Sequence, residues 1–386
     1  MKTAPRFSAL ALLCALALAG CAPSGAVPSA SPTPPPTPTA TPTPTATPDP
    51  LAAMSLGDKV GQLFMVGTPV EGADPTTLAA VRDDHIGGVF LHGRSDAGAA
   101  AIAELVRGFT SAAPADGPPL WVATDQEGGT VQVLSGPGFD DIPSAVDQAA
   151  QDDAALRASA AAWAGQLAAA GVTMNLGPVA DVVSSPESAA SNPPIGALAR
   201  EYGYDQATVA AKAGAFAAGM RDGGVLPTLK HFPGLGRVDD NTDYSTGVTD
   251  QVVTADGPDV GVYASVLAQG DAVVMMSTAD YALIDPGVPA AFSPAVVGVL
   301  REGLGFDGVI TVDDLSAADQ VEVYSPADRA TLAIDAGVDL LLVSADPSVY
   351  PEMHQAVLAR AEADPAFAEK VDAAVRRVLD AKAAMP

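Results

Sequence analysis

Cysteine is nearly missing from this chain of 386 residues, and both cysteines, Cys14 and Cys21, lie close to the N-terminus. The rest of the chain therefore cannot form disulfides, bind zinc through thiolates or use a cysteine nucleophile. Positive charge is also scarce, because 46 acidic residues outnumber 19 basic ones and give a net charge of −27. Such a protein is unsuited to binding nucleic acid or adhering directly to anionic lipid, and we interpret the charge as a solubilising surface.

The apolar run near the N-terminus, Ser8 to Ala19, is too short to cross a bilayer as a helix. It follows a short positive segment and ends at Leu-Ala-Gly-Cys, residues 18–21, which resembles the bacterial lipobox. The resemblance implies cleavage of a signal peptide, residues 1–20, and a lipid on the sulfur of Cys21. The alternative is an ordinary signal peptide in which this cysteine has no such role.

Residues 21–50 are dominated by Pro, Thr, Ser and Ala. This composition cannot bury a core and favours extended polyproline conformations, so we interpret the segment as a linker between the membrane and a folded domain. No second linker interrupts residues 51–386, and their number suits a single α/β barrel domain. We expect an exported protein, anchored to the outer face of the cytoplasmic membrane or the cell envelope through its lipid only.

Short apolar runs alternate with Ala-rich, helix-like segments throughout this domain, which predicts a parallel (β/α)8 barrel rather than an open sheet. The expected strands are Leu63–Val66, Gly88–Leu91, Trp121–Thr124, Val172–Leu176, Leu226–Leu229, Ala272–Met276, Val309–Val312 and Val338–Val343. The expected helices include Asp153–Ala170, Asp205–Gly219, Pro294–Leu300, Pro326–Asp335 and a closing helix, Asp364–Ala384.

Polar residues follow nearly all of these apolar runs. In a barrel the carboxyl ends of the strands share one face, where enzymes of this fold place their active sites. The residues at these positions are His92, Arg94, Asp125, Asp181, Lys230, His231, Ser277, Asp313, Asp314 and Ser344.

Charged residues are most concentrated after the fifth expected strand, in LKHFPGLGRVDDNTD, residues 229–243. An apolar stretch ends in Lys230 and His231, and a Pro-Gly turn then leads into a loop that carries three aspartates. Basic and acidic groups crowded beyond a strand end are suited to binding and cleaving a hydroxyl-rich substrate.

Two further motifs carry carboxylates after strands. Asp313, in TVDDL, can attack an anomeric carbon or stabilise an oxocarbenium ion; alternatively, Asp313 or Asp314 caps the following helix. Asp125 opens the motif DQEGG, where a carboxylate can accept hydrogen bonds from neighbouring sugar hydroxyls and the glycines permit a tight turn. The alternative for this motif is an ordinary polar loop.

A third motif begins with NPPIG at Asn192 and ends at Arg200. The guanidinium of Arg200 can hold a substrate hydroxyl or carboxylate, or it can pair with Glu201 or Asp181.

Taken together, these motifs resemble glycoside hydrolase family 3, and in particular its bacterial single-domain β-N-acetylglucosaminidases. The resemblance covers essentially all of residues 51–386. It rests on five motifs in the family's order, namely KVGQLFMVG at Lys59–Gly67, TDQEGG at Thr124–Gly129, NPPIG to Arg at Asn192–Arg200, KHFPGLG at Lys230–Gly236 and VDDL at Val312–Leu315.

The resemblance implies a TIM-like barrel and a retaining mechanism in which Asp313 is the nucleophile. It implies that four residues hold the hydroxyls of the non-reducing sugar, namely Asp125, Arg200, Lys230 and His231. It implies neither a metal nor an organic cofactor. The substrate would be terminal β-linked N-acetylglucosamine, including muropeptide fragments of the cell wall, and we expect a monomer.

This chain departs from the family where the proton donor is expected. Members of the subgroup carry Asp-Ser-His after KHFPGxG, whereas this chain has Asn241-Thr242-Asp243. Asp243 can itself be the general acid/base, Asp239 or Asp240 can replace it, or the site lacks an efficient donor. If the donor is lacking, the chain is a catalytically weak sugar-binding lipoprotein. A separate alternative to a hexosaminidase is a β-glucosidase-like enzyme of the same family.

Overall fold

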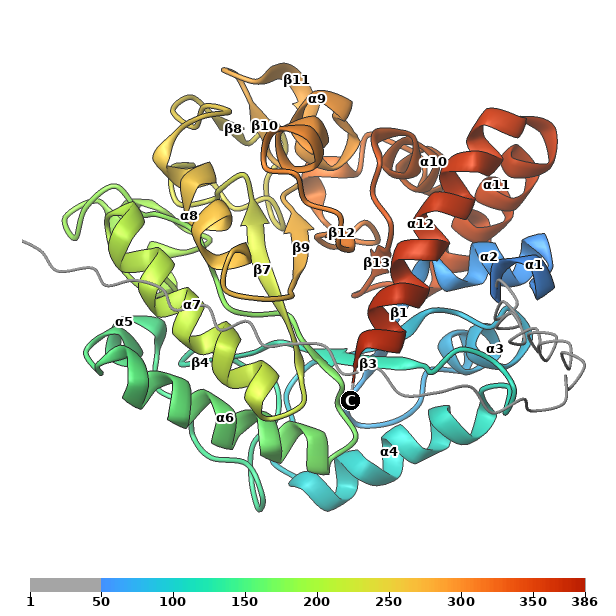
Figure 1. Cartoon of the computed structure of the whole chain (residues 1–386), viewed down its shortest axis with the longest axis horizontal. Coiled ribbons are helices and arrows are strands. Elements are labelled where there is room, and N and C mark those ends of the chain that lie inside the picture. Colours follow the sequence, from blue (N-terminus) through green and yellow to red (C-terminus); the bar gives the residue numbers. More distant parts are fainter. Residues whose placement is uncertain (1–49, 386) are drawn as a thin grey trace, which may run out of the picture. The chain divides into compact units, whose positions relative to one another are not determined.

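The computed structural model describes residues 50–385, so the predicted signal peptide, Cys21 and nearly all of the linker lie outside the described residues. Eight parallel strands form one sheet in the order β12-β9-β7-β6-β3-β2-β1-β13 (Figure 1). All eight lie where the sequence predicts a strand. They are β1 (Phe64–Pro69), β2 (Gly88–His92), β3 (Trp121–Thr124), β6 (Met174–Asn175), β7 (Leu226–Phe232), β9 (Val273–Met276), β12 (Ile310–Val312) and β13 (Leu341–Val343).

The sheet closes into a barrel where its two outer strands meet. Thr311 and Leu340 form a parallel bridge beside β12 and β13. The backbone amides of Asp339 and Leu340 also donate to the carbonyl of Ile310, at 2.8 and 3.1 Å. The predicted (β/α)8 barrel is therefore confirmed.

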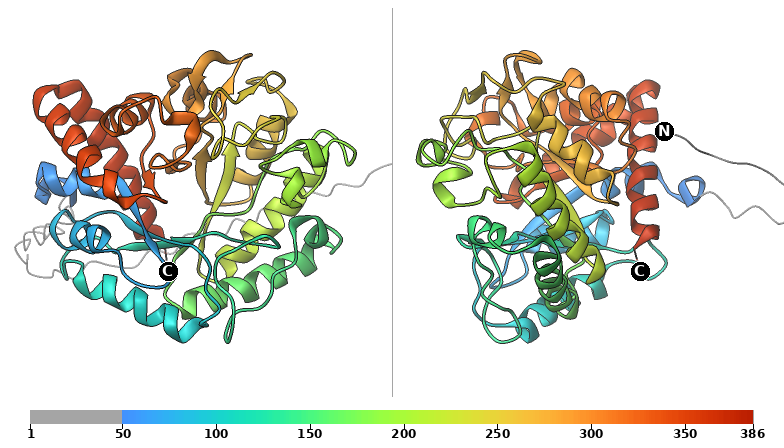
Figure 2. Two further views of the ribbon diagram at one scale, coloured as in Figure 1. Left: turned by 180° about the vertical axis from the view of Figure 1, so that it is seen from behind. Right: turned by 60° about the vertical axis from the view of Figure 1, so that its left-hand side comes forward.

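Helices surround the strands, as α4, α6 and α7 show in Figures 1 and 2. The five expected helices are present, with ends within three residues of the prediction. None of the described helices has the length and apolar character needed to cross a membrane. The helices are α1 (Pro50–Ala53), α2 (Leu56–Gln62), α3 (Pro75–Asp83), α4 (Ala99–Ala112), α5 (Ala145–Ala149), α6 (Asp153–Ala169), α7 (Gln206–Asp222), α8 (Pro258–Leu267), α9 (Pro294–Gly298), α10 (Pro326–Ala336), α11 (Tyr350–Ala363) and α12 (Pro365–Ala384).

Local sequence explains where these helices begin. The side chains of Asp152, Asp205 and Ser325 each accept a hydrogen bond from the backbone amide three residues further on. Such caps satisfy amides that the first helical turn leaves unpaired. Close packing of α6 on α7 depends on Gly219, because a Cβ there would lie 2.4 Å from the carbonyl oxygen of Arg157.

Strand side chains alternate between the barrel interior and the layer beneath the helices. Met65 of β1 belongs to the interior cluster, whereas its neighbours Phe64 and Val66 belong to the outer core. This two-residue alternation is expected of barrel strands, which carry side chains on both faces. Val378 of α12 also belongs to the interior cluster, and the Lys382 ammonium lies 5.2 Å from the centre of the Trp121 ring at the start of β3. Helix α12 therefore covers the amino-terminal end of the barrel.

Two small sheets lie in the loops that follow the carboxyl ends of barrel strands. One is the hairpin of β4 (Gln126–Gly128) and β5 (Val131–Gln132), which comes directly after β3. The other joins β8 (Thr249–Asp250), β10 (Asp280–Tyr281) and β11 (Asp285–Pro289), which follow β7 and β9. These five strands lack the apolar runs that mark the barrel strands, so the sequence did not predict them.

Candidate active site

A cavity of about 790 Å³ opens at the carboxyl ends of the barrel strands. Its apolar lining includes Phe90, Leu176, Met275 and Leu342, which belong to the barrel interior. All six residues that the sequence predicts for catalysis or sugar binding line this one cavity. Its charged lining consists of Arg94, Asp125, Arg200, Lys230, His231, Asp243, Asp313 and Asp314.

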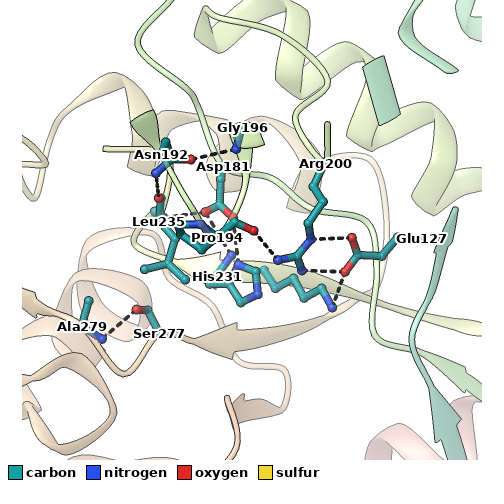
Figure 3. A network of polar contacts seen from close by, with 12 residues as sticks. Glu127, Asp181, Asn192, Pro194, Gly196, Arg200, His231, Leu235, Ser277 and Ala279 are labelled. Atoms are coloured by element: carbon teal, nitrogen blue, oxygen red, sulfur yellow. Dashed lines mark hydrogen bonds and ion pairs between the residues drawn. The ribbon is translucent and has the colours of Figure 1, made fainter. Parts of the chain in front are cut away.

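Four of these charged groups are joined with Glu127 and Asp181 in two networks. Figure 3 labels Glu127 and Arg200 of the first network and Asp181 and His231 of the second. In the first, the Lys230 ammonium lies 2.6 Å from a carboxylate oxygen of both Asp125 and Glu127. Arg200 donates from Nε and Nη2 to the two oxygens of Glu127, at 2.9 and 2.7 Å. Arg200 therefore pairs with Glu127, and not with Glu201 as one alternative from the sequence had it.

The electrostatics of this network keep its charges fixed. Burial raises the pKa of Glu127, but the cations of Arg200 and Lys230 outweigh it and hold that pKa at about 2. Burial lowers the pKa of Lys230, but Asp125 and Glu127 raise it to a net value above the ordinary one. Buried charges that are paired in this way remain ionised at neutral pH and present polar groups for a sugar.

The DQEGG motif shapes the turn that carries Glu127. Gly128 has φ +110°, and a Cβ there would lie 2.2 Å from the carbonyl oxygen of Pro143, so no other residue fits. Gln148 fixes the same turn by donating from Nε2 to the Glu127 carbonyl at 2.8 Å. The tight turn and close backbone approach predicted for the two glycines are confirmed.

The second network orients His231 at the carboxyl end of β7 (Figure 3). Its Nδ1 lies 2.8 Å from Oδ2 of Asp181. The other Asp181 oxygen accepts the backbone amides of His231 and Leu235, at 3.1 and 2.7 Å. Because Asp181 is buried behind the imidazole and occupies Nδ1, the Nε2 edge of His231 is the one free to face the cavity. The Lys230–His231 and Phe232–Pro233 peptide bonds are both cis.

The two adjacent aspartates after β12 have different surroundings. Asp314 accepts hydrogen bonds from the backbone amides of Ser316 and Ser344 and from the Ser316 hydroxyl, at 2.9, 2.8 and 2.6 Å. It therefore fixes the loop after β12 against the end of β13. Asp313 accepts one hydrogen bond, from the amide of Asp314 at 2.9 Å, and lines the cavity. Of the two aspartates, Asp314 is thus the one that fixes the local structure, and the chemical role expected of Asp313 stays a prediction.

Asp243 lies at the open mouth of the cavity, where its side chain remains exposed to solvent. The cavity walls nevertheless remove part of its water, and this desolvation together with the negative charge of Asp313 raises its pKa to about 6. Electrostatic interactions with His231 and Arg200 lower this pKa. Asp243 is thus a carboxyl group that exchanges a proton at mildly acidic pH.

The other aspartates of this loop, Asp239 and Asp240, are exposed and do not contribute to the described lining of the cavity. Among the strand-end residues, His92, Asp181 and Ser277 also lie outside that lining. Two charged residues of the site have no role assigned from the sequence, namely Arg94, which lines the cavity, and Glu127, which pairs with Lys230 and Arg200. For Glu127 the available signal was its place two residues after Asp125, within the same motif.

Among the described residues, no group of three or more His, Cys, Asp or Glu side chains is arranged to hold a metal ion.

Comparisons with known proteins agree with this geometry. A family model described as the glycosyl hydrolase family 3 N terminal domain matches residues 55–381. Beta-hexosaminidase LpqI of Mycobacterium tuberculosis is 33% identical over 325 residues, covering 80% of this chain and 79% of that protein. A beta-hexosaminidase of Xylella fastidiosa is 35% identical over 286 residues, covering 70% of this chain and 82% of that protein. The crystal structure of a beta-N-acetylhexosaminidase from Beutenbergia cavernae matches with a TM-score of 0.85 and 57% identity, covering 86% of this chain and 99% of that one.

Proposed function

The chain belongs to glycoside hydrolase family 3, and from that premise we propose that it is a retaining exo-β-N-acetylhexosaminidase that removes terminal β-linked N-acetylglucosamine. The observation that carries the proposal is the pairing of Asp313 and Asp243 in one cavity. The negative charge of Asp313 helps to raise the pKa of Asp243 to about 6. Glycosidic cleavage requires one carboxyl group that attacks the sugar and a second one that donates a proton.

Four residues hold the terminal sugar in this proposal, namely Asp125, Arg200, Lys230 and His231. An ammonium group has three N–H donors, and Lys230 uses two of them on Asp125 and Glu127, which leaves one for a hydroxyl. Asp125 is only partly buried, at 26% side-chain exposure, so it can accept from sugar hydroxyls as well. The buried ion pairs fix these groups before the sugar arrives.

The reaction proceeds in two displacements. Asp313 attacks the anomeric carbon while protonated Asp243 gives its proton to the glycosidic oxygen, so the bond to the leaving group breaks and a glycosyl-aspartate forms. Asp243, now a carboxylate, takes a proton from water, which attacks the same carbon and releases Asp313. A pKa near 6 suits a group that must serve first as acid and then as base.

The substrate class is supported by the relatives, because the three named above are described as beta-hexosaminidases or a beta-N-acetylhexosaminidase. We extend the proposal to muropeptide fragments of the cell wall. An exported protein that is lipidated on Cys21 and spaced from the membrane by residues 21–50 would meet such fragments. Its contacts in this proposal are the glycan and, through the lipid alone, the membrane, and it acts as a monomer.

The test compares hydrolysis of aryl β-N-acetylglucosaminides and aryl β-glucosides by the wild type, Asp313→Ala and Asp243→Ala. We expect the wild type to prefer the N-acetylated sugar and Asp313→Ala to lose at least about 1,000-fold in kcat. Asp243→Ala should lose much more activity with a poor leaving group than with an activated one.

Three outcomes contradict the proposal in different ways. A preference for glucosides would indicate a β-glucosidase-like enzyme. Binding of N-acetylglucosamine without turnover would indicate a sugar-binding lipoprotein. Equal losses with both leaving groups in Asp243→Ala would remove this residue from the acid/base role.

A further inference from the structure

The segment that carries Asp243 crosses the mouth of the cavity with little side-chain support. The recorded hydrogen bonds of Asp243 among the described residues involve its backbone, and Tyr244 is 78% exposed. The backbone amides of both residues donate locally to Asn241, to its side-chain oxygen at 2.9 Å and its carbonyl at 3.1 Å. The position of Asp243 therefore depends on what holds the two ends of this segment.

Both ends are held by one residue, Gln320. Its backbone amide donates to the carbonyl of Thr242 at 3.1 Å. Its side-chain oxygen accepts a hydrogen bond from the backbone amide of Val248 at 2.8 Å. Its Nε2 donates a hydrogen bond to the carbonyl of Val248 at 3.2 Å. All three residues are at most 5% exposed, so water does not compete for these bonds. Gln320 thus brackets residues 243–247.

Gln320 lies in the same loop as the proposed nucleophile. This loop leaves β12 at Asp313 and reaches the 3₁₀ turn η5 (Asp319–Val321), which contains Gln320. The backbone amide of Asp319 donates to the carbonyl of Asp243 itself, at 3.4 Å. A single stretch of chain therefore carries the nucleophile and holds the segment of the proton donor.

A third element fixes the orientation of Gln320. The amide of Asp280 in β10 donates to the carbonyl of Val248 at 3.0 Å, so that oxygen receives two hydrogen bonds. Burial and the charge of Asp285 raise the pKa of Asp280, whereas a hydrogen bond with Gln320 lowers it. The Gln320 amide is therefore enclosed by the two segments that it joins.

We propose that Gln320 is a positioning residue for the proton-transfer step, because it sets where Asp243 stands relative to the leaving-group oxygen. The inference rests on the proposed function, in which Asp243 is the acid/base. A neutral amide suits the position, since it supplies Val248 with both a donor and an acceptor. A carboxylate there would add negative charge beside Asp280. Loss of the side chain would free the Val248 end of the segment and leave the Thr242 contact intact.

The test is Gln320→Met, which keeps the length of the side chain and removes its amide group. We expect kcat/KM to fall about ten-fold for an alkyl β-N-acetylglucosaminide and less than about two-fold for a nitrophenyl one, because only the poor leaving group needs a well-placed proton. Deuterium exchange of the Val248 amide should become faster in the same variant. Both effects are measured on the full chain.

The matched control is Gln62→Met at the opposite end of the barrel. Gln62 is equally buried and also uses both ends of its amide, on the carbonyl of His85 and on Lys382. We expect this variant to have a lower melting temperature and to change kcat/KM by the same factor for both substrates. If Gln320→Met does not fold, Gln320→Glu is the second variant, because it keeps an oxygen that can accept the hydrogen bond from the Val248 amide. Its kcat/KM should again fall more for the alkyl than for the nitrophenyl substrate, but by a smaller factor.

Equal losses with both substrates in an otherwise active enzyme would overturn the positioning role alone. Unchanged exchange at Val248 would do the same. If the wild type turns over neither substrate, the proposed function fails and this inference falls with it.

Discussion

Three aspartates around the cavity differ in how many hydrogen bonds they accept. The carboxylates of Asp181 and Asp314 each accept hydrogen bonds from at least two backbone amides, and they hold the adjoining loops in place. Burial and the negative charge of Asp313 raise the pKa of Asp243, and its recorded hydrogen bonds among the described residues are those of its backbone. A carboxyl group that is not stabilised by donors is the one that can pick up a proton near neutral pH. The sequence identified Asp243 by its place in a motif, but its pKa depends on the cavity walls, which no local pattern encodes.

The raised pKa of Asp243 predicts the pH dependence of the reaction. A general acid must be protonated, so kcat/KM with a poor leaving group should fall above pH about 6, approaching ten-fold per pH unit. In Asp243→Asn this alkaline limb should be lost, because an amide does not titrate. The measurement is a pH profile of both proteins with the same substrate. An alkaline limb that persists in Asp243→Asn would assign it to another group.

At the scale of the secondary-structure elements, sequence predicted the long ones well. Helix α12 was predicted as Asp364–Ala384 and begins one residue later. What it packs against could not be read from the sequence, because Lys382 looks like an ordinary surface residue. Its ammonium is in fact buried, donates to Gln62 and to the carbonyl of Gly87, and has no carboxylate partner among the described residues.

Burial without a carboxylate lowers the pKa of Lys382 from 10.5 to about 7. Between these two values the unfolded chain holds the proton and the folded chain does not, so this group makes stability rise with pH. The rise is up to about 2 kcal/mol between pH 7 and 9. Lys382→Met should therefore show a flatter pH dependence of the free energy of unfolding than the wild type.

Denaturant unfolding at several pH values checks this prediction. Lys370→Met is the control, because Lys370 lies on the same helix and is 47% exposed beside Asp335. If the free energy of unfolding changes with pH in the same way in wild type and Lys382→Met, the Lys382 amine is not buried in its neutral form.

At the scale of the whole molecule, the barrel could be predicted because eight apolar runs that alternate with helix-like segments leave few other arrangements. The motifs at the strand ends then met in one cavity, as the shared carboxyl face requires. The three-stranded sheet and the Gln320 contacts could not be predicted, since they join residues far apart in sequence through a two-residue pairing and a single side chain.

The N-terminal segment offers a further prediction at this scale. If Cys21 carries the lipid anchor, Cys21→Ser should release an active protein into the soluble fraction, because signal and linker are otherwise unchanged. Cell fractionation with an activity assay measures this. A wild type that is already soluble after export would contradict the proposed anchor.

The central claim is that Asp313 forms the covalent bond to the sugar. The most direct measurement uses a fluorinated N-acetylglucosamine analogue that forms the glycosyl-enzyme quickly and releases it slowly, followed by digestion and mass spectrometry. We expect the sugar mass on the peptide that contains Asp313, and none in Asp313→Ala. A label on any other residue, or rapid turnover with inversion of the anomeric carbon and no label, would contradict the account.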